Sequence, residues 1–197
     1  MRKKYAGRHD IDGDFIFDID TTLTGSGSSN NDQFYIPISD GTTQGGWNIA
    51  FEVDWGDGST SQVNSSNFAT AGLHTYAASG IYTIRCSGTV AGFAFQAAAY
   101  DDAPKLLNIQ QWGCFKLDGG RAVSAPGLQF MSCINMTEVS ATDVPNNTMR
   151  TTGRTTARGF RGTFWQCQDM VRINNLNNWK IRRSNTTNSF VMNIMFY

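Results

Sequence analysis

The feature that most constrains the fold is a short alternating stretch that ends in a glycine-containing turn. Apolar and polar residues alternate from Trp47 to Trp55, in the sequence WNIAFEVDW. This period of two is typical of a half-buried β-strand. A Gly-Asp-Gly turn follows at residues 56–58 and tolerates positive φ angles. We therefore expect the strand to fold back into a hairpin with residues 60–64.

The same alternation recurs through the first hundred residues and predicts an all-β region. Only 16% of the residues are charged and 12% are aromatic, and Thr, Ser, Asn and Gly are abundant, a composition that favours strands and turns over helices. Strands separated by turn residues at this spacing predict an antiparallel sandwich. The expected strands cover residues 14–20, 33–39, 47–54, 60–64, 81–86 and 90–95.

Three motifs follow one another in this region: VDWGDGS at 53–59, HTY at 74–76 and GIYTI at 80–84. Together they resemble the PKD family of immunoglobulin-like domains, over residues 14–97. The resemblance implies that Trp55 and Tyr82 pack in the core, that the Tyr76 hydroxyl ties a loop to the backbone, and that the histidine and aspartates stabilise turns. The residues that carry this structural signature are Trp55, Gly56, Asp57, Gly58, His74, Tyr76, Gly80 and Tyr82.

A change of composition near residues 97–104, with the sequence DDAP at 101–104, indicates a domain junction. Residues 1–100 hold five Lys/Arg and ten Asp/Glu, whereas residues 101–197 hold eleven and six. The two halves carry −5 and +5, which supports two domains. We expect an arm at 1–13, which is either a loose tail or a docking arm for a neighbouring subunit, then a sandwich at 14–100 and a repeat region at 101–197.

The repeat region contains one phrase twice. Residues 130–139 align with residues 164–173 at a constant offset, and Met195, Phe196 and Tyr197 look like the start of a third copy. Apolar residues that recur at such a regular period predict stacked coils, each burying one face against the next. The expected repeat core consists of Phe130, Cys133, Met136, Phe164, Cys167 and Met170.

The F-x-x-C-x-x-M phrase is similar to the BspA-like leucine-rich repeats of bacterial and bacteriophage surface proteins, over residues 105–197. The resemblance implies a short, irregular solenoid, in which Cys133 and Cys167 are small buried residues of a ladder. In phage proteins such repeats often follow a PKD-like domain. Because a solenoid end needs a cover, we expect Phe196 and Tyr197 to contact another copy, another protein or a continuation of the chain.

A basic insert at residues 146–162 lengthens the repeat unit. It is either a solvated loop or a patch that meets an acidic partner, such as the sandwich of a neighbouring copy or an anionic glycan. Basic residues recur after the second unit. The arginines concerned are Arg150, Arg154, Arg158, Arg161, Arg182 and Arg183.

Neither a metal, a cofactor nor catalysis is expected. Asp10, Asp12 and Asp14 resemble part of a calcium loop, but the Gly and the Glu at the sixth and twelfth positions are missing. The four cysteines include no C-x-x-C pair and only two histidines accompany them, so neither a zinc site nor a disulfide framework is expected. Glu52 and the hairpin aspartates are explained by turn chemistry, and His74 is the one plausible base.

These patterns together predict a non-catalytic structural or surface protein of a bacteriophage particle. The chain shows neither a signal peptide nor a membrane span, and its net charge of zero argues against general nucleic-acid binding. Virion proteins are made in the host cytoplasm without a signal. The expected role is capsid decoration or a tail or fibre component, with other virion proteins, copies of itself and host-surface glycan as partners. The alternatives are a fragment of a bacterial cell-surface adhesin and a glycan-degrading enzyme.

Overall fold

The computed structural model describes residues 13–38, 49–90, 93–95, 100–115, 129–145 and 163–178. Within these residues strands predominate, as predicted, and the only α-helix described is α1 (Phe68–Ala71), beside the 3-10 turns Ala103–Lys105 and Leu176–Asn178. The strands are β1 (Phe15–Asp20), β2 (Gln33–Tyr35), β3 (Ala50–Asp54), β4 (Thr60–Asn64), β5 (Leu73–Thr75), β6 (Ile81–Thr89), β7 (Leu106–Gln111), β8 (Glu138–Val139) and β9 (Arg172–Ile173).

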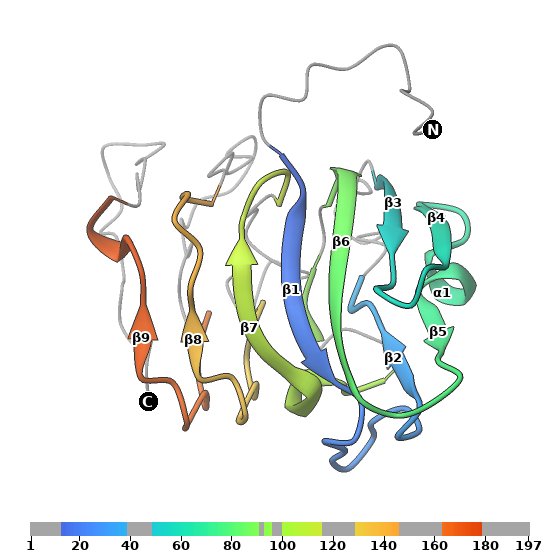
Figure 1. The fold of residues 1–197 in the computed structure, drawn as a ribbon, viewed down its shortest axis with the longest axis horizontal. Helices are drawn as coiled ribbons and strands as arrows, with labels where there is room; N and C mark the ends of the chain where they lie inside the picture. Colours follow the sequence, from blue (N-terminus) through green and yellow to red (C-terminus); the bar gives the residue numbers. More distant parts are fainter. Residues whose placement is uncertain are drawn as a thin grey trace, which may run out of the picture.

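Seven of these strands form one sheet in the order β4-β3-β6-β1-β7-β8-β9 (Figure 1). Neighbouring strands are antiparallel from β4 to β7. From β7 to β9 the pairing is parallel, and each strand comes one repeat later in the chain. The predicted hairpin is confirmed as β3 and β4, with Val53 opposite Ser61.

The strands β2 and β5 pair in a second, smaller sheet. This sheet contacts the core face of the large one, since the ring of Phe34 in β2 lies 6.1 Å from that of Phe17 in β1. The side chains of Ile36 and Ile38, which follow β2, are also buried. Tyr35 and Pro37, on the other face of the expected alternation, are buried as well. Residues 34–38 are therefore buried on both faces, and only Gln33–Tyr35 form a regular strand.

Alternation separates buried from more exposed side chains in β3, whereas Ile16 of β1 and Tyr35 of β2 are buried on the opposite face of their strands. In the hairpin, Phe51, Val53 and Trp55 lie in the core, as predicted, whereas Trp47 falls outside the described residues. The expected strand at 90–95 is not seen: Val90 and Phe93 form single bridges only, and residues 91 and 92 are not described. The Phe93 ring lies among the aromatic rings of the core.

One hydrophobic core lies under the large sheet and includes residues from both sequence halves. At its centre, the rings of Phe15, Phe93, Phe115 and Phe130 have centroids 4.6–5.7 Å apart. After the predicted junction near residue 100, β7 pairs antiparallel with β1 and parallel with β8, so the strands on both sides of the junction share a sheet and a core.

Candidate functional site

The sequence-predicted residues gather at two described places, the β3–β4 hairpin and the parallel stack. The remaining candidates fall outside the described residues. They are Asp10, Asp12, Arg150, Arg154, Arg158, Arg161, Arg182, Arg183, Phe196 and Tyr197, together with the insert at 146–162.

The hairpin turn is held by two aspartates, as the sequence predicts. The Asp54 carboxylate accepts the Gly56 backbone N–H at 3.0 Å. The Asp57 carboxylate accepts the backbone N–H and the hydroxyl of Ser59, at 2.9 and 2.6 Å. Gly56 and Gly58 adopt left-handed φ angles of +83° and +90°, a conformation that costs glycine little. Both carboxylates are thus used as hydrogen-bond acceptors inside their own turn.

His74 of β5 closes over this turn. Its Nε2 lies 2.8 Å from Asp57 Oδ2 and 3.5 Å from Ser59 Oγ. The imidazole stacks on the Trp55 indole with centroids 4.7 Å apart and planes 11° apart, and it meets the Tyr76 ring edge-on at 4.5 Å. The histidine therefore links the hairpin to the small sheet.

Two tyrosines complete the cluster. The buried Tyr76 hydroxyl donates to the Trp55 carbonyl oxygen at 3.1 Å, which confirms the expected tie to the backbone. The Tyr82 ring stacks on that of Tyr76 at 3.8 Å. Gly80, just before β6, donates its N–H to Thr21 Oγ1 at 2.9 Å and so fixes the start of the strand. These contacts give every predicted signature residue a structural role.

The electrostatics of the turn favour a charged Asp57. Partial burial acts to raise its pKa, but hydrogen bonds from Ser59 and His74 outweigh this and lower the pKa from 3.8 to about 2. The pKa of Tyr76 is raised instead, chiefly by burial and further by the negative charge of Asp57. Tyr76 is therefore neutral and acts as a hydrogen-bond donor at physiological pH.

The Ser59–His74–Asp57 group lacks the geometry of a catalytic triad. In a triad the carboxylate orients one imidazole nitrogen while the other accepts the serine proton. Here both Asp57 and Ser59 approach the same nitrogen, Nε2, and the Ser59 hydroxyl also donates to Asp57. The arrangement stabilises a turn and gives Ser59 no separate base.

The parallel stack repeats its contacts at the offset that the sequence predicts. The rings of Phe130 and Phe164 stack at 5.5 Å with planes 13° apart. Ser132 and Gln166, which occupy equivalent positions in the two units, both adopt left-handed backbone angles, with φ of 64° and 62°. Sequence reasoning missed these two positions because neither residue type signals such a turn.

The ladder residues are less uniformly buried than predicted. Cys133 and Met136 are fully buried, whereas Cys167 and Met170 of the last described coil are only partly so. The Cys167 thiol donates to the Phe130 carbonyl oxygen at 3.1 Å. Burial raises the pKa of the Cys133 thiol, which favours its protonated form in the core.

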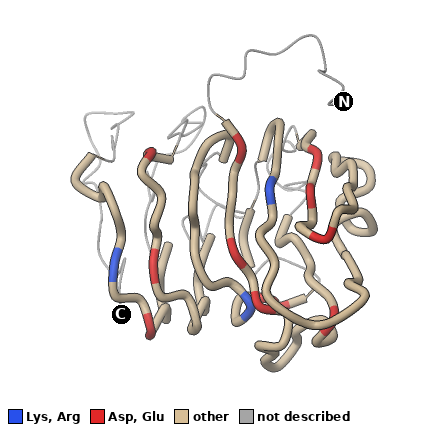
Figure 2. The backbone as a smooth tube through the Cα atoms, viewed as in Figure 1, with Lys and Arg blue, Asp and Glu red and all other residues tan. Residues whose placement is uncertain are grey.

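Polar side chains connect the strands on the outer face of the sheet. Asp18 in β1 accepts hydrogen bonds from Thr83 of β6, at 2.7 Å, and from Asn108 and Gln110 of β7, at 3.2 and 2.7 Å. The Asn108 side-chain amide also donates to the hydroxyl of Ser140, just after β8, at 3.0 Å. Figure 2 shows acidic residues along β1, β3 and β8, and single basic residues on β6 and β9. Alternation predicts which face is outward, but not these cross-strand pairs.

A buried charged network, missed by the sequence reasoning, lies at the junction. The Lys105 ammonium group is 3.2 Å from the Asp102 carboxylate, and both side chains are fully buried. Lys105 Nζ also donates to Ser29 Oγ at 2.7 Å and to the carbonyl oxygens of Asn30 and Gln33, both at 2.8 Å. Because charged residues are usually exposed, the sequence carries no signal for this cluster.

The described part of the chain holds no group of three or more metal-ligating side chains. Of the three aspartates in the expected calcium loop, only Asp14 is described, and it accepts a hydrogen bond from Ser87 at 2.6 Å. Among the described residues, no helix is long and apolar enough to cross a membrane.

Comparison with known proteins adds no relative: no family model, no curated protein and no solved structure matches this chain.

Proposed function

We propose that this protein is a non-catalytic structural or surface component of a bacteriophage particle, which acts in assembly or in host-surface adhesion. In this proposal the first part of the fold is a PKD-type immunoglobulin-like sandwich and the second a short leucine-rich-repeat-like solenoid. Its place is the virion, as a capsid decoration or as part of the tail or a fibre.

The observation that carries the proposal is the continuous sheet. An antiparallel part and a parallel stack share seven strands and one core, so the two parts move as one body. Such a body is a stiff spacer that needs no disulfide, and the four cysteines are free thiols. A stiff spacer with a broad polar face suits binding by shape, in which complementary surfaces meet without any bond being made or broken.

The outer face offers the chemistry for such contacts. It presents carboxylates, amides and hydroxyls that already bond one another across the strands, as around Asp18. Groups held in place in this way meet a partner with little loss of conformational entropy. The partners we propose are other virion proteins, further copies of this chain and host-surface glycan.

The proposal is tested by locating the full-length protein. Gold-labelled antibodies should bind purified phage particles at regular positions and leave the envelope of uninfected bacteria unlabelled. Labelling of the bacterial envelope, together with an export signal in a longer gene product, would instead support a cell-surface adhesin.

The enzyme alternative has a separate test. Purified protein should release no sugar from host cell-wall polysaccharide. Turnover that disappears in Asp57→Asn, with the fold unchanged by circular dichroism, would contradict the non-catalytic assignment. Asp169→Asn, which alters an exposed carboxylate of the last described coil, is the matched control.

A further inference from the structure

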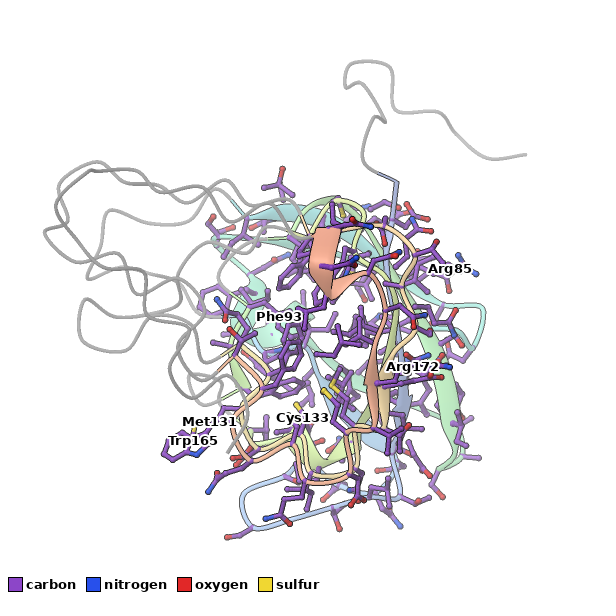
Figure 3. The ribbon with its side chains drawn as sticks, turned by 90° about the vertical axis from the view of Figure 1, so that its left-hand side faces the viewer. Arg85, Phe93, Met131, Cys133, Trp165 and Arg172 are labelled. Atoms are coloured by element: carbon purple, nitrogen blue, oxygen red, sulfur yellow. The ribbon has the colours of Figure 1, made fainter. Side chains whose placement is uncertain are left out.

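The two edges of the large sheet differ in the residues that they present. Within the described residues, β4 and β9 are the last strands of the order. An unpaired strand edge can add a strand from another chain, and charged side chains or proline at the edge oppose this. Figure 3 views the molecule from the β9 edge, where Arg172 points away from the core and Cys133 lies inside it. The β4 sequence, TSQVN, contains neither a charged residue nor a proline, so this edge lacks both protections.

Every second residue of β4 directs its backbone groups away from β3. The Trp55 N–H donates to the Ser59 carbonyl oxygen at 3.1 Å, so this opposed pair is a hydrogen-bonded one. Hydrogen-bonded and non-hydrogen-bonded pairs alternate along an antiparallel ladder. The register therefore makes Gln62 and Asn64 non-hydrogen-bonded positions. Their N–H and C=O groups face outward along the edge, where a further strand could bind.

The side-chain amide of Asn67 occupies this part of the edge. Its Oδ1 accepts the Asn64 backbone N–H at 2.7 Å, and its Nδ2 donates to the Gln62 carbonyl oxygen at 2.9 Å. One amide thus bonds the C=O of one residue and the N–H of the residue two positions later, as a residue of a neighbouring parallel strand does. Asn67 therefore lies where the next strand would pair.

Asn67 is also the residue that precedes α1, which lies beside β4 (Figure 1). An asparagine at the start of a helix usually accepts an N–H of the first helical turn with its side chain. Asn67 makes no such bond. The loop is instead held by the Asn67 N–H, which donates to the Asn64 carbonyl oxygen at 3.2 Å, and by Ser66, which donates twice to Asn64 Oδ1. These bonds hold the Asn67 amide against the edge and not against the helix.

We propose that Asn67 closes the β4 edge and prevents a second copy of this chain from adding its own β4 there. Two such strands would pair antiparallel about a twofold axis, which brings the same patch of both copies together. The side chains of Thr60 and Gln62 are exposed and uncharged, so they would not oppose this pairing by repulsion. The cap leaves other surfaces, such as the outer face of the sheet, for contacts between copies. This inference does not depend on the proposed phage function.

Sedimentation velocity of the full chain at about 0.5 M salt, where exposed charges are screened, tests the proposal. Asn67→Ala removes both bonds and uncovers the Gln62 carbonyl and the Asn64 N–H. We expect the dissociation constant for self-association to fall by about tenfold or more relative to the parent protein. Ser66→Ala, which removes a hydroxyl bond in the same loop but keeps the Asn67 amide, should associate as the parent does.

A second substitution shows whether the edge is the contact. Gln62→Pro in the Asn67→Ala background removes the outward N–H of residue 62, and proline on an edge strand opposes strand addition. Association should therefore return to the parent level. The proposal is overturned if Asn67→Ala leaves association unchanged, if Ser66→Ala raises it equally, or if the gain persists with Gln62→Pro.

Amide hydrogen exchange in the parent protein tests the cap without any substitution. The Asn64 N–H is bonded to Asn67, whereas the Thr60 N–H faces outward in the same way without this partner. We expect exchange at Asn64 to be slower than at Thr60 by about tenfold or more. Equal exchange at the two positions would show that the Asn67 amide does not occupy the edge.

Discussion

At the scale of single residues, one buried hydroxyl, that of Tyr76, stabilises the group of side chains around the β3–β4 hairpin. Tyr76 donates to the Trp55 carbonyl oxygen in a site that is closed to water, and a buried acceptor that loses its donor costs about 1–3 kcal/mol. Tyr76→Phe should therefore lower the free energy of unfolding by about 1–2 kcal/mol in urea titrations. Tyr82→Phe is the control, because its hydroxyl bond to Ala78 is exposed and its loss should cost less. Equal losses of stability in the two variants would show that the buried hydrogen bond to Trp55 contributes no more than the exposed one to Ala78.

The same cluster should make stability depend on pH through Asp57. Its pKa is about 2 in the folded protein and 3.8 ordinarily, so folding favours the ionised form. The resulting stabilisation is present above about pH 4 and is lost as the pH falls towards 2. In Asp57→Asn, the urea midpoint should change less over this range than in the parent protein. Asp169→Asn should retain the parent pH dependence, and a parent-like slope in Asp57→Asn would contradict the assignment.

At the scale of elements, the 3-10 turn Ala103–Lys105 anchors the loop before β2. The Lys105 ammonium group satisfies oxygens of Ser29, Asn30 and Gln33, while Asp102 accepts the backbone N–H groups of Ser29 and Tyr35 at 2.8 and 2.7 Å. Every charge in this network is compensated, which is the condition for burying an ion pair. The network therefore joins the two sequence halves at their junction.

Removing one partner of this ion pair should be costly. Lys105→Met leaves the Asp102 carboxylate buried and unpaired, and we expect a loss of about 3–5 kcal/mol in the free energy of unfolding. Arg85→Met, which removes an exposed cation, should change it by less than about 0.5 kcal/mol. The double variant Asp102→Ala/Lys105→Met should lose less than the two single losses combined. Strictly additive losses would mean that the two charges do not interact.

Sequence patterns predicted the elements whose signal is local. The β3–β4 hairpin followed from alternation and from the Gly-Asp-Gly turn, and the constant offset placed Phe130 against Phe164. Contacts between distant segments were not predictable in this way. Lys105 and Ser29 are 76 residues apart, and the pairing of β1 with β7 across the expected domain junction has no local signature. Partly exposed ladder residues were missed because periodicity shows which face turns inward, but not how many layers cover it.

At the scale of the whole molecule, the described residues are acidic and the rest of the chain is basic. The described residues hold twelve of the sixteen acidic residues and three of the sixteen basic ones, a formal charge of −9. The rest of the chain therefore carries +9, since the total is zero. Both halves are acidic within the described part, so the described residues and the rest of the chain differ in charge more strongly than the two sequence halves do.

This division predicts that any self-association weakens with salt. Exposed charges attract over about 10 Å at 0.1 M ionic strength and over about 3 Å at 1 M, so attraction between the acidic described part of one copy and the basic remainder of another should weaken as salt is added. Sedimentation velocity of the full chain should show a lower average mass at about 0.5 M salt than at about 0.05 M salt, because the higher salt screens the exposed charges. Glu52→Lys, on the outer sheet face opposite Gln62, should reduce association further. Asp169→Lys makes the same change of charge on the last described coil and should have a smaller effect if the sheet face is the contact. If the average mass does not change with salt, apolar packing and not charge would be the cause of association.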